Sequence, residues 1–171
     1  GLKYSDMEAE VIFSSEIDRF AQKSYLANYP ESNLVGDITK IEASQIPEHD
    51  ILMGGFPCQT FSIAGKRDGF EDTRGTLFFD IARIIKAKRP KAFLLENVKN
   101  LVGHDKGRTF ATIRKALEDM DYKVYYQVFP AKDFGVPQNR ERIYIVGFDK
   151  NQVKNYQDFE YPVPPKTPTR V

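Results

Sequence analysis

Cysteine and histidine are scarce in this sequence, and tryptophan is absent. The 171 residues include one cysteine, Cys58, and two histidines, His49 and His104. One cysteine cannot form an internal disulfide bond, and neither histidine lies in a CxxC or HExxH pattern that would indicate a zinc site. We therefore expect no structural metal and a protein that works in a reducing compartment.

Long apolar runs and an excess of charge are also missing. No run approaches the ~20 residues that a membrane-spanning helix needs, and residues 1–6 lack the apolar core of a signal peptide. These absences predict a cytoplasmic protein without membrane contact. The net charge of +1 neither supports nor excludes a nucleic-acid partner, because a local basic patch can bind DNA without an overall positive charge.

The sequence does contain a regular alternation of strand-like and helix-like segments. With 41% hydrophobic residues, the chain can bury one substantial core. The apolar spacing predicts strands at 10–15, 50–53 and 92–95, and helices from residue 17 to Pro30, at 76–88 and at 109–120. Alternating strands and helices are typical of an α/β fold with a parallel sheet that helices cover.

The pattern changes after residue 120. Residues 122–129 and 142–148 are β-rich runs joined by an irregular segment in which no helix is predicted. We expect them to form an antiparallel pair at the edge of the sheet. The Pro-rich stretch 161–168 cannot continue a helix or a central strand and favours an extended path. We therefore predict one domain at 1–150 and a connector at 151–171.

Three side chains that can carry chemistry follow predicted strands, where open α/β sheets bind their ligands. They are Glu16, Cys58 and Glu96. Cys58 lies in a Gly- and Pro-rich turn and is placed like a nucleophile, although a lone cysteine is more often a small buried hydrophobic residue. Glu96 by itself is most simply a solvated loop residue. If Glu96 lies opposite the Cys58 thiol, its carboxyl group can act as an acid.

A group of polar side chains precedes the second β-rich run. Strand alternation would place Gln138, Arg140 and Arg142 on one face, with their donor groups pointing the same way. The alternative is an edge strand that charged side chains protect from pairing. These residues alone do not decide between the two interpretations.

Three blocks occur in order along the chain: Pro57-Cys58-Gln59, Glu96-Asn97-Val98 and Gln138-Asn139-Arg140-Glu141-Arg142. In this order they resemble the Pro-Cys-Gln, Glu-Asn-Val and Gln-x-Arg-x-Arg blocks of the cytosine-C5 DNA methyltransferases, and nearly the whole chain aligns with that family's pattern. The resemblance implies a Rossmann-like, S-adenosylmethionine-dependent methyltransferase fold, with a mostly parallel sheet and an antiparallel edge hairpin. Residues 1–150 would be the catalytic domain.

The resemblance also implies a mechanism. Cys58 would add to C6 of a cytosine flipped out of double-stranded DNA, so that C5 can take a methyl group from S-adenosylmethionine. Glu96 would hydrogen-bond to N3 of the base as the adduct forms. Arg142 would donate to O2, and Arg140 would help to hold the site.

Contacts with the cofactor and with DNA follow from the same resemblance. Glu16 would accept hydrogen bonds from the ribose hydroxyls, Ile17 would pack on the adenine, and Asp37 would accept from the adenine amino group. The remaining cofactor contacts would be Ile38, Pro57 and Leu77. Residues 62–70, with glycines and two cations, would form a lid, although an exposed surface loop is the simpler alternative. The expected DNA contacts are Gln59, Ser62, Lys66, Arg67, Arg74 and Gln138.

Two parts of the family pattern are absent from this sequence. No Phe-x-Gly-x-Gly turn for the methionine end of the cofactor precedes residue 1, and no target-recognition segment follows the Pro-rich stretch. The chain is therefore expected to be a fragment, or one half of a split enzyme whose second chain carries the recognition segment. The DNA sequence that the enzyme reads is not encoded in these residues.

The leading hypothesis is a DNA cytosine-C5 methyltransferase from a restriction-modification system, or an orphan modification enzyme. Methylation of tRNA is an alternative, because one branch of the family acts on RNA. A second alternative is a non-catalytic DNA-binding or assembly subunit, but DNA binding alone does not require Cys58, Glu96 and Arg142 together. Methylases of free pyrimidine nucleotides also use a Pro-Cys pair, yet they resemble this chain in no other block.

Overall fold

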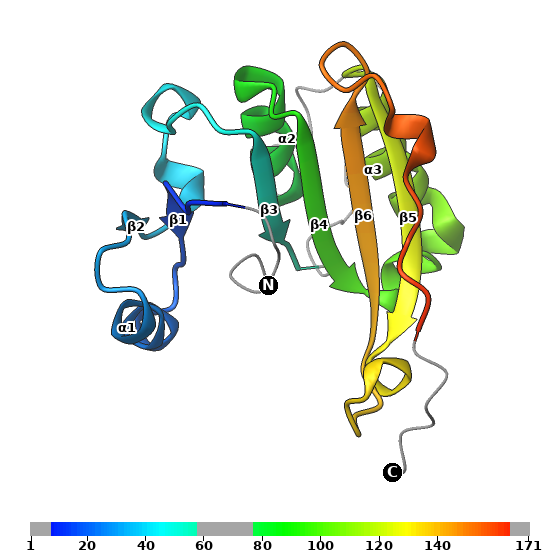
Figure 1. Cartoon of the computed structure of the whole chain (residues 1–171), viewed down its shortest axis with the longest axis horizontal. Helices are drawn as coiled ribbons and strands as arrows, with labels where there is room; N and C mark the ends of the chain where they lie inside the picture. Colours follow the sequence, from blue (N-terminus) through cyan, green and yellow to red (C-terminus); the bar gives the residue numbers. More distant parts are fainter. Residues whose placement is uncertain (1–7, 58–76, 165–171) are drawn as a thin grey trace. The chain divides into compact units, whose positions relative to one another are not determined.

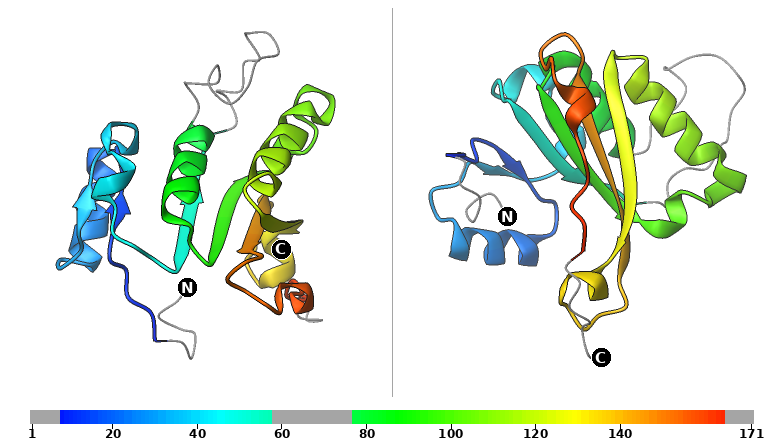
Figure 2. Two further views of the ribbon diagram at one scale, coloured as in Figure 1. Left: turned by 90° about the horizontal axis from the view of Figure 1, so that it is seen from above. Right: turned by 45° about the vertical axis from the view of Figure 1, so that its right-hand side comes forward.

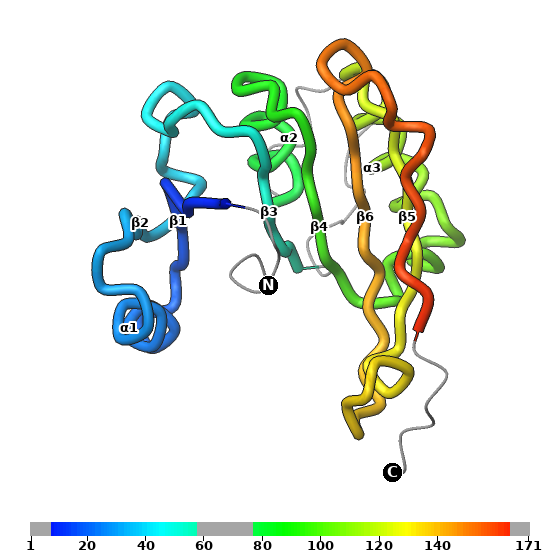
Figure 3. Tube along the Cα trace, viewed as in Figure 1, coloured from blue at the N-terminus to red at the C-terminus, as the bar shows by residue number. Residues whose placement is uncertain are grey.

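The computed structural model describes residues 8–57 and 77–164. The chain forms two compact units, Gly1–His49 and Asp50–Val171, and each contains its own sheet. Figure 1 labels the helices and strands of both units, and Figure 3 follows the same path as a tube. Within the described residues, no helix is both long and apolar enough to span a bilayer.

The first unit is built around a short parallel ladder. Its regular elements are β1 (Ser14–Ser15), α1 (Arg19–Asn28) and β2 (Leu34–Val35), followed by the 3₁₀ helices Ile38–Lys40 and Ala43–Gln45. β1 pairs with β2, and α1 connects them. Asp18 caps α1, because its carboxylate accepts hydrogen bonds from the N–H groups of Phe20 and Ala21 at 2.9 and 2.8 Å.

The predicted strand at 10–15 is wrong over most of its length. Only Ser14 and Ser15 have ladder partners, because the neighbouring strand β2 is itself only two residues long. A strand is defined by the ladder that it joins, so an apolar run without a matching neighbour stays irregular. The order of strand and helix is confirmed, with α1 beginning two residues after the predicted start.

The second unit contains a four-stranded sheet in the order β3-β4-β6-β5. Its strands are β3 (Ile51–Gly55), β4 (Ala92–Val98), β5 (Tyr122–Pro130) and β6 (Glu141–Asp149). β3 and β4 run parallel, whereas β6 runs antiparallel to both β4 and β5. The predicted antiparallel pair is confirmed, with β5 at the edge and β6 inside the sheet. The connection between them, predicted to be irregular, contains the 3₁₀ helix Ala131–Phe134.

Two helices of the described chain cover one face of this sheet (Figure 2). They are α2 (Leu77–Lys88) and α3 (Arg108–Glu118), which confirms the helices predicted near these positions. Phe78 of α2 and Leu117 of α3 are completely buried, as are Leu95 of β4 and Ile145 of β6, and they share one core. Alternate residues of each strand reach this core because strand side chains point to opposite faces in turn.

Gly147 in β6 makes room for an aromatic ring. The side chain of Phe93 is 1% exposed, and its ring centroid lies 5.1 Å from that of Tyr122. A Cβ atom on residue 147 would lie 2.0 Å from Cζ of Phe93, far inside van der Waals contact. Gly147 is therefore required for the close approach of this ring to the β6 backbone.

The segment that follows the sheet covers part of its other face. The ring centroid of Phe159 lies 5.3 Å from that of Tyr125 and 5.2 Å from that of Phe148. The hydroxyl of Tyr161 donates a hydrogen bond to the carbonyl oxygen of Tyr144 at 2.9 Å. Figure 1 shows this segment, drawn in orange and red, in front of β5. The connector therefore starts as a packed segment, and its role as a link to further chain stays a prediction.

A buried ion pair lies where β6 ends. Asp149 is 1% exposed, and its Oδ2 lies 2.6 Å from Nη2 of Arg89. Burial alone raises the pKa of the Asp149 carboxyl. Hydrogen bonds from the Gln152 side chain and the Asn151 N–H, together with Arg89, outweigh burial and bring the pKa below its ordinary value of 3.8. Arg89 also donates to the carbonyl oxygen of Met120, so this cluster joins the sheet to the ends of both helices.

Asparagine at position 149 is expected to lower the free energy of unfolding by about 1–3 kcal/mol at neutral pH, because Arg89 loses its charged partner. A carboxyl group with a lowered folded-state pKa stabilises the protein above its unfolded-state pKa. That contribution is lost as the pH falls through the folded-state value. The difference between the two proteins should therefore shrink below about pH 4. Urea unfolding across this pH range measures it.

A matched control is asparagine at Asp121, whose carboxylate is 72% exposed and lies 4.0 Å from Lys150. An exposed pair of this kind contributes little to stability, so this variant should unfold like the parent protein. A stability loss in Asp149→Asn that is the same at neutral and acidic pH would contradict the role of the charged carboxylate.

Candidate active site

Glu96 lies within β4, on the face of the sheet away from α2 and α3. It is in register with Gly55 of β3 and Tyr144 of β6, and its side chain is 37% exposed. The predicted strand stopped one residue before Glu96, but β4 continues to Val98 because its last residues keep ladder partners in β6. The interpretation of Glu96 as a loop residue is therefore wrong, and the carboxylate stands on a rigid strand.

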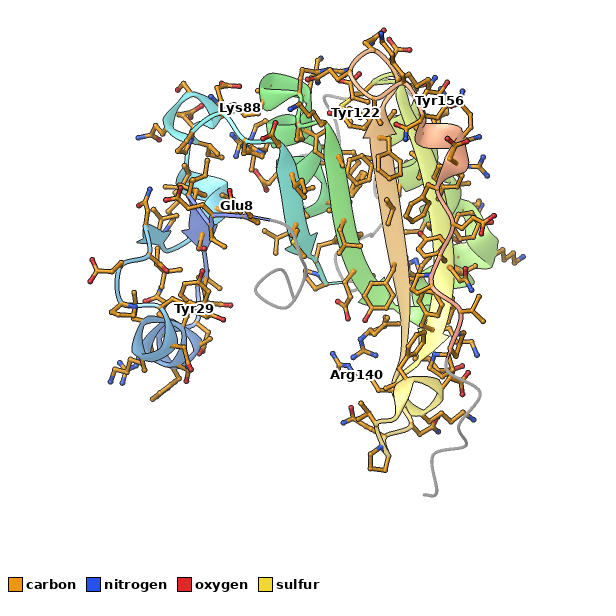
Figure 4. All side chains as sticks on the ribbon, in the orientation of Figure 1. Glu8, Tyr29, Lys88, Tyr122, Arg140 and Tyr156 are labelled. Carbon is orange, nitrogen blue, oxygen red and sulfur yellow. The ribbon has the colours of Figure 1, made fainter. Side chains whose placement is uncertain are left out.

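Two arginines approach the Glu96 carboxylate. Nε of Arg142 lies 2.8 Å from Oε1 of Glu96, and Nη2 of Arg140 lies 3.8 Å from the same oxygen. Arg142 is in register with Val98, two positions along β4 from Glu96, so the two side chains are diagonal neighbours on one face. Figure 4 labels Arg140, where the chain enters β6. The Arg142 side chain is 20% exposed and that of Arg140 is 51% exposed, so Arg142 is the more firmly held.

The predicted alternation of Gln138, Arg140 and Arg142 along one strand is wrong. β6 begins at Glu141, so two of the three residues precede it. Their loop is shaped by Gly135, whose φ is +84°, and it is closed by a backbone hydrogen bond from residue 131 to residue 140 at 2.8 Å. Gln138 is exposed in this loop. Loop geometry, rather than strand periodicity, brings Arg140 to Glu96.

β3 ends beside Glu96, and its last residue, Gly55, precedes Cys58 by three positions. A Cβ atom on Gly55 would lie 3.5 Å from Oε2 of Glu96. The carbonyl oxygen of Phe56 accepts a hydrogen bond from Nδ2 of Asn97 at 2.6 Å, and Asn97 is 2% exposed. Sequence reasoning included Asn97 only as a member of a block. It follows Phe93 and Leu95 at every second position of the strand, which was a signal that this amide is buried and must have a partner.

Six predicted site residues lie outside the described residues. They are the expected nucleophile and five expected DNA contacts: Cys58, Gln59, Ser62, Lys66, Arg67 and Arg74. The predicted lid at 62–70 lies there as well. Their roles stay predictions.

Glu16 and Ile17 directly follow β1 in the first unit. The N–H of Glu16 donates to the carbonyl of Val35 at 3.0 Å, so β1 and β2 stay side by side up to this residue. Oε1 of Glu16 accepts a hydrogen bond from the N–H of Asp18 at 2.8 Å. The Ile17 side chain is 70% exposed. This strand end therefore presents a carboxylate next to an apolar side chain that is open to a ligand.

Asp37 follows β2 and caps a 3₁₀ helix. Its Oδ1 accepts hydrogen bonds from the hydroxyl of Thr39 at 2.7 Å and from the Thr39 N–H at 3.1 Å. These hydrogen bonds, with a smaller contribution from Lys40, lower the pKa of the Asp37 carboxyl. Because β1 and β2 are parallel neighbours, Glu16 and Asp37 lie at the same edge of the small sheet, where α/β folds bind ligands.

The remaining predicted cofactor contacts belong to both units. Ile38 is half-buried in the first unit. In the second unit, Pro57 is exposed after β3, and Leu77 is half-buried at the start of α2, where it packs against the core.

Lys99 and Glu141 form a further ion pair next to the Glu96 site. Nζ of Lys99 lies 3.0 Å from each carboxylate oxygen of Glu141. The pair joins the 3₁₀ helix Lys99–Leu101, which follows β4, to the first residue of β6. Sequence reasoning did not assign either residue, because 42 positions separate them. Among the described residues, no group of three or more His, Cys, Asp or Glu side chains is arranged to hold a metal ion.

Comparisons with known proteins agree with the blocks that the sequence contains. The chain matches the C-5 cytosine-specific DNA methylase family over residues 1–171. It is 67% identical over 161 residues to the Type II methyltransferase M.SsoII of Shigella sonnei, and the matched region covers 94% of this chain and 42% of that protein. It is 49% identical over 156 residues to the Type II methyltransferase M.HhaI of Haemophilus parahaemolyticus, and the matched region covers 91% of this chain and 47% of that protein.

Solved structures show the same fold. A DNMT2 mutant from Spodoptera frugiperda matches 94% of this chain and 49% of its own length, with a TM-score of 0.74 at 22% identity. The Dnmt2 methyltransferase of S. pombe matches 94% of this chain and 52% of its own length, with a TM-score of 0.67 at 19% identity. The chain thus spans less than half of the two Type II methyltransferases named above. It belongs to the C-5 cytosine-specific DNA methylase family.

Proposed function

We propose that this chain is part of a DNA (cytosine-5)-methyltransferase of a restriction-modification system, and that it carries the residues which act on the base. The names of its Type II methyltransferase relatives support this proposal. The observation that carries it is the Glu96 carboxylate, which Arg142 holds beside the end of β3. An acid and a cation fixed near the strand that leads to the chain's only cysteine suit the addition of a thiolate to a pyrimidine ring.

In the proposed reaction, the Cys58 thiolate forms a bond to C6 of the cytosine, and electron density moves toward N3. Glu96 donates a hydrogen bond to N3, and Arg142 donates to O2. C5 would become nucleophilic and bond to the methyl carbon, while the bond from that carbon to sulfur would break and leave a neutral thioether. Loss of the C5 proton to a base then restores the ring double bond and releases Cys58 as the thiolate. The base must leave the duplex stack for this chemistry, at a cost of a few kcal/mol.

S-adenosylmethionine, when bound, supplies a methyl group on a positively charged sulfur. The first unit offers groups that suit its adenosine part. Glu16 and Asp37 are acceptors at adjacent strand ends for the ribose hydroxyls and the adenine amino group. Ile17 is an exposed apolar side chain for the adenine ring. The chemistry of these two acceptors and of the apolar side chain fits the cofactor.

Double-stranded DNA in the cytoplasm is the proposed substrate. Gln138, exposed before β6, is proposed to contact it. The same role is proposed for the residues beyond the described range that were predicted to bind DNA. The target-recognition segment would come from residues outside this chain or from a second chain.

The function is tested by following a labelled methyl group from S-adenosylmethionine into mixed-sequence duplex DNA and into tRNA, with Cys58→Ser as the control. Label at C5 of cytosine in DNA, absent from the control, is the expected result. Duplex DNA that contains 5-fluorocytosine should also trap the protein covalently, because its C5 carries no proton to lose. Label in tRNA alone would reassign the substrate. DNA binding without label or trapping would favour a non-catalytic subunit.

Alanine at position 37 is expected to weaken S-adenosylmethionine binding by about 10- to 100-fold, because one hydrogen bond to a charged group is lost. Isothermal titration calorimetry of the parent and the variant measures the change in Kd. Thr39→Val is the matched control. It removes the hydroxyl that donates a hydrogen bond to Asp37, and it leaves the Asp37 carboxylate in place. Equal losses in both variants would mean that the local fold, and not the carboxylate, binds the cofactor.

A further inference from the structure

The small sheet of the first unit is too short to fix its own ligand-binding edge. β1 and β2 share two residue pairs, and Ser15 with Val35 is the last of them. Glu16 and Asp37, the two proposed acceptors for the adenosine part of the cofactor, both lie beyond this pair. A ladder of two residues gives little rigidity, so other contacts must set the spacing between the two carboxylates.

Each of the two carboxylates is oriented by its own turn. Oε1 of Glu16 accepts a hydrogen bond from the N–H of Asp18 at 2.8 Å. Oδ1 of Asp37 accepts one from the N–H of Thr39 at 3.1 Å. The second oxygen of each carboxylate is left for a ligand, since Oδ2 of Asp37 lies 3.7 Å from Nζ of Lys40, a side chain that is 79% exposed and weakly held. The two turns do not fix the distance between the two acids.

The Glu16 side of this edge is anchored to both β2 and α1. The N–H of Glu16 donates to the carbonyl oxygen of Val35 at 3.0 Å. From α1, Nε2 of Gln22 donates to the carbonyl oxygen of Glu16 at 2.5 Å. Both backbone polar groups of Glu16 are therefore bound, and this residue is the fixed point of the edge.

The Asp37 side is tied to β1 by the hydroxyl of Ser15. Oγ of Ser15 donates to the carbonyl oxygen of Gly36 at 2.6 Å, beyond the last ladder pair. Gly36 directly precedes Asp37, and Ser15 directly precedes Glu16. This hydrogen bond therefore joins the chain neighbours of the two acceptors, and it sets how far apart the acceptors stand.

We propose that Ser15 is a positioning residue for the adenosine part of the cofactor: its hydroxyl holds Gly36 so that Glu16 and Asp37 bind one ligand at the same time. This inference rests on the proposed function. A ligand that uses both acceptors gains from their fixed spacing, because groups that are ordered in advance cost less to order on binding. A ligand that uses only one acceptor gains little from it.

The test compares the binding of two ligands to the parent and to Ser15→Ala by isothermal titration calorimetry. One ligand is S-adenosylhomocysteine, which carries the ribose hydroxyls and the 6-amino group. The other is its purine analogue, in which hydrogen replaces the 6-amino group and leaves Asp37 without a donor. Ser15→Ala should raise the Kd of S-adenosylhomocysteine about five- to tenfold, as the loss of one hydrogen bond does. The Kd of the analogue should rise about twofold or less.

Two further variants control for the substitution. Ser15→Thr keeps the hydroxyl and suits a strand, so it should restore the parent Kd for S-adenosylhomocysteine. Ser14→Ala removes the neighbouring hydroxyl, which lies 2.7 Å from the hydroxyl of Tyr25 on α1, so it should leave the ratio of the two Kd values unchanged. A loss in Ser15→Thr as large as that in Ser15→Ala would contradict the role of the hydroxyl.

The ligand pair separates this inference from the proposed function. A parent protein that binds both ligands with the same Kd would contradict the role of Asp37, and the inference would fail with it. A parent that prefers S-adenosylhomocysteine, and a Ser15→Ala variant that loses the same factor for both ligands, would overturn the role of Ser15 alone. General damage to the local fold weakens every ligand alike.

A second readout needs no ligand. The carbonyl carbon resonance of Gly36 reports the hydrogen bond that this carbonyl accepts from Ser15. It should shift in Ser15→Ala and stay in place in Ser14→Ala. An unchanged resonance in Ser15→Ala would overturn the proposal.

Discussion

Glutamine at position 96 is expected to lower kcat for methyl transfer by about 10²- to 10⁴-fold, the usual effect of losing a general acid. Glutamine has nearly the size of glutamate and keeps an oxygen for Nε of Arg142, which lies 2.8 Å from Oε1 of Glu96. It cannot transfer a proton toward N3 of the base as the Cys58 adduct forms. KM for DNA should change little, because the interaction develops in the transition state. Single-turnover kinetics with saturating cofactor separate the two effects.

The control for this variant is Glu118→Gln on α3. Glu118 also pairs with an arginine, at 2.7 Å from Nε of Arg114, but in a surface pair between residues four apart in the same helix. Losing that pair should leave kcat and KM unchanged. A Glu96→Gln protein with the parent kcat and a raised KM would show that Glu96 binds DNA rather than acting in the chemical step.

Alanine at position 147 is expected to destabilise the second unit by about 3 kcal/mol, at the upper end of what overpacking costs. The added methyl carbon would lie 2.0 Å from Cζ of Phe93 and 2.3 Å from its Cε1. The ring has little freedom to move, because Phe93 is 1% exposed and packs on Tyr122, which is completely buried. Chemical denaturation followed by circular dichroism measures the loss.

Alanine at position 103 is the matched control, because no described residue other than its two chain neighbours has an atom within 4 Å of a Cβ at Gly103. It should leave stability within about 0.5 kcal/mol of the parent. Phe93→Leu combined with Gly147→Ala should cost less than the sum of the two single changes, because a smaller side chain makes room for the methyl group. Fully additive losses would show that the clash with Phe93 is not the cause.

The sequence was sufficient for features with a local signature. The apolar spacing predicted α2 and α3, and the β-rich runs predicted the antiparallel pair of β5 and β6. The order of the blocks pointed to Glu96, Arg140 and Arg142 as one group. The sequence was misleading where length or loop path decides the structure. β1 is short because β2 offers only two partners, and Gln138 lies in a loop that strand periodicity does not describe.

Other features depend on contacts between distant parts of the chain. Gly147 reads as an ordinary strand glycine until the ring of Phe93, from another strand, is placed over it. From the sequence alone, Lys99 and Glu141 are two separate surface charges. The register of β4 and β6 brings them together. Asn97 acquires its partner only when the end of β3 is placed beside β4. Single-sequence patterns carry no information on such pairings.

The position of β6 has a consequence for the order in which the protein can fold. Among the strands of residues 8–57 and 77–164, β6 comes last in the sequence, yet it lies between β4 and β5 and supplies ladder partners to both. A nascent chain that ends before residue 141 leaves β5 without a ladder partner and one edge of β4 unpaired, and unpaired edges are prone to association with other chains. The arginines that hold Glu96 arrive with the same late segment. Synthesis of this stretch therefore joins β5 to β4 and brings the two arginines to Glu96 in the same step.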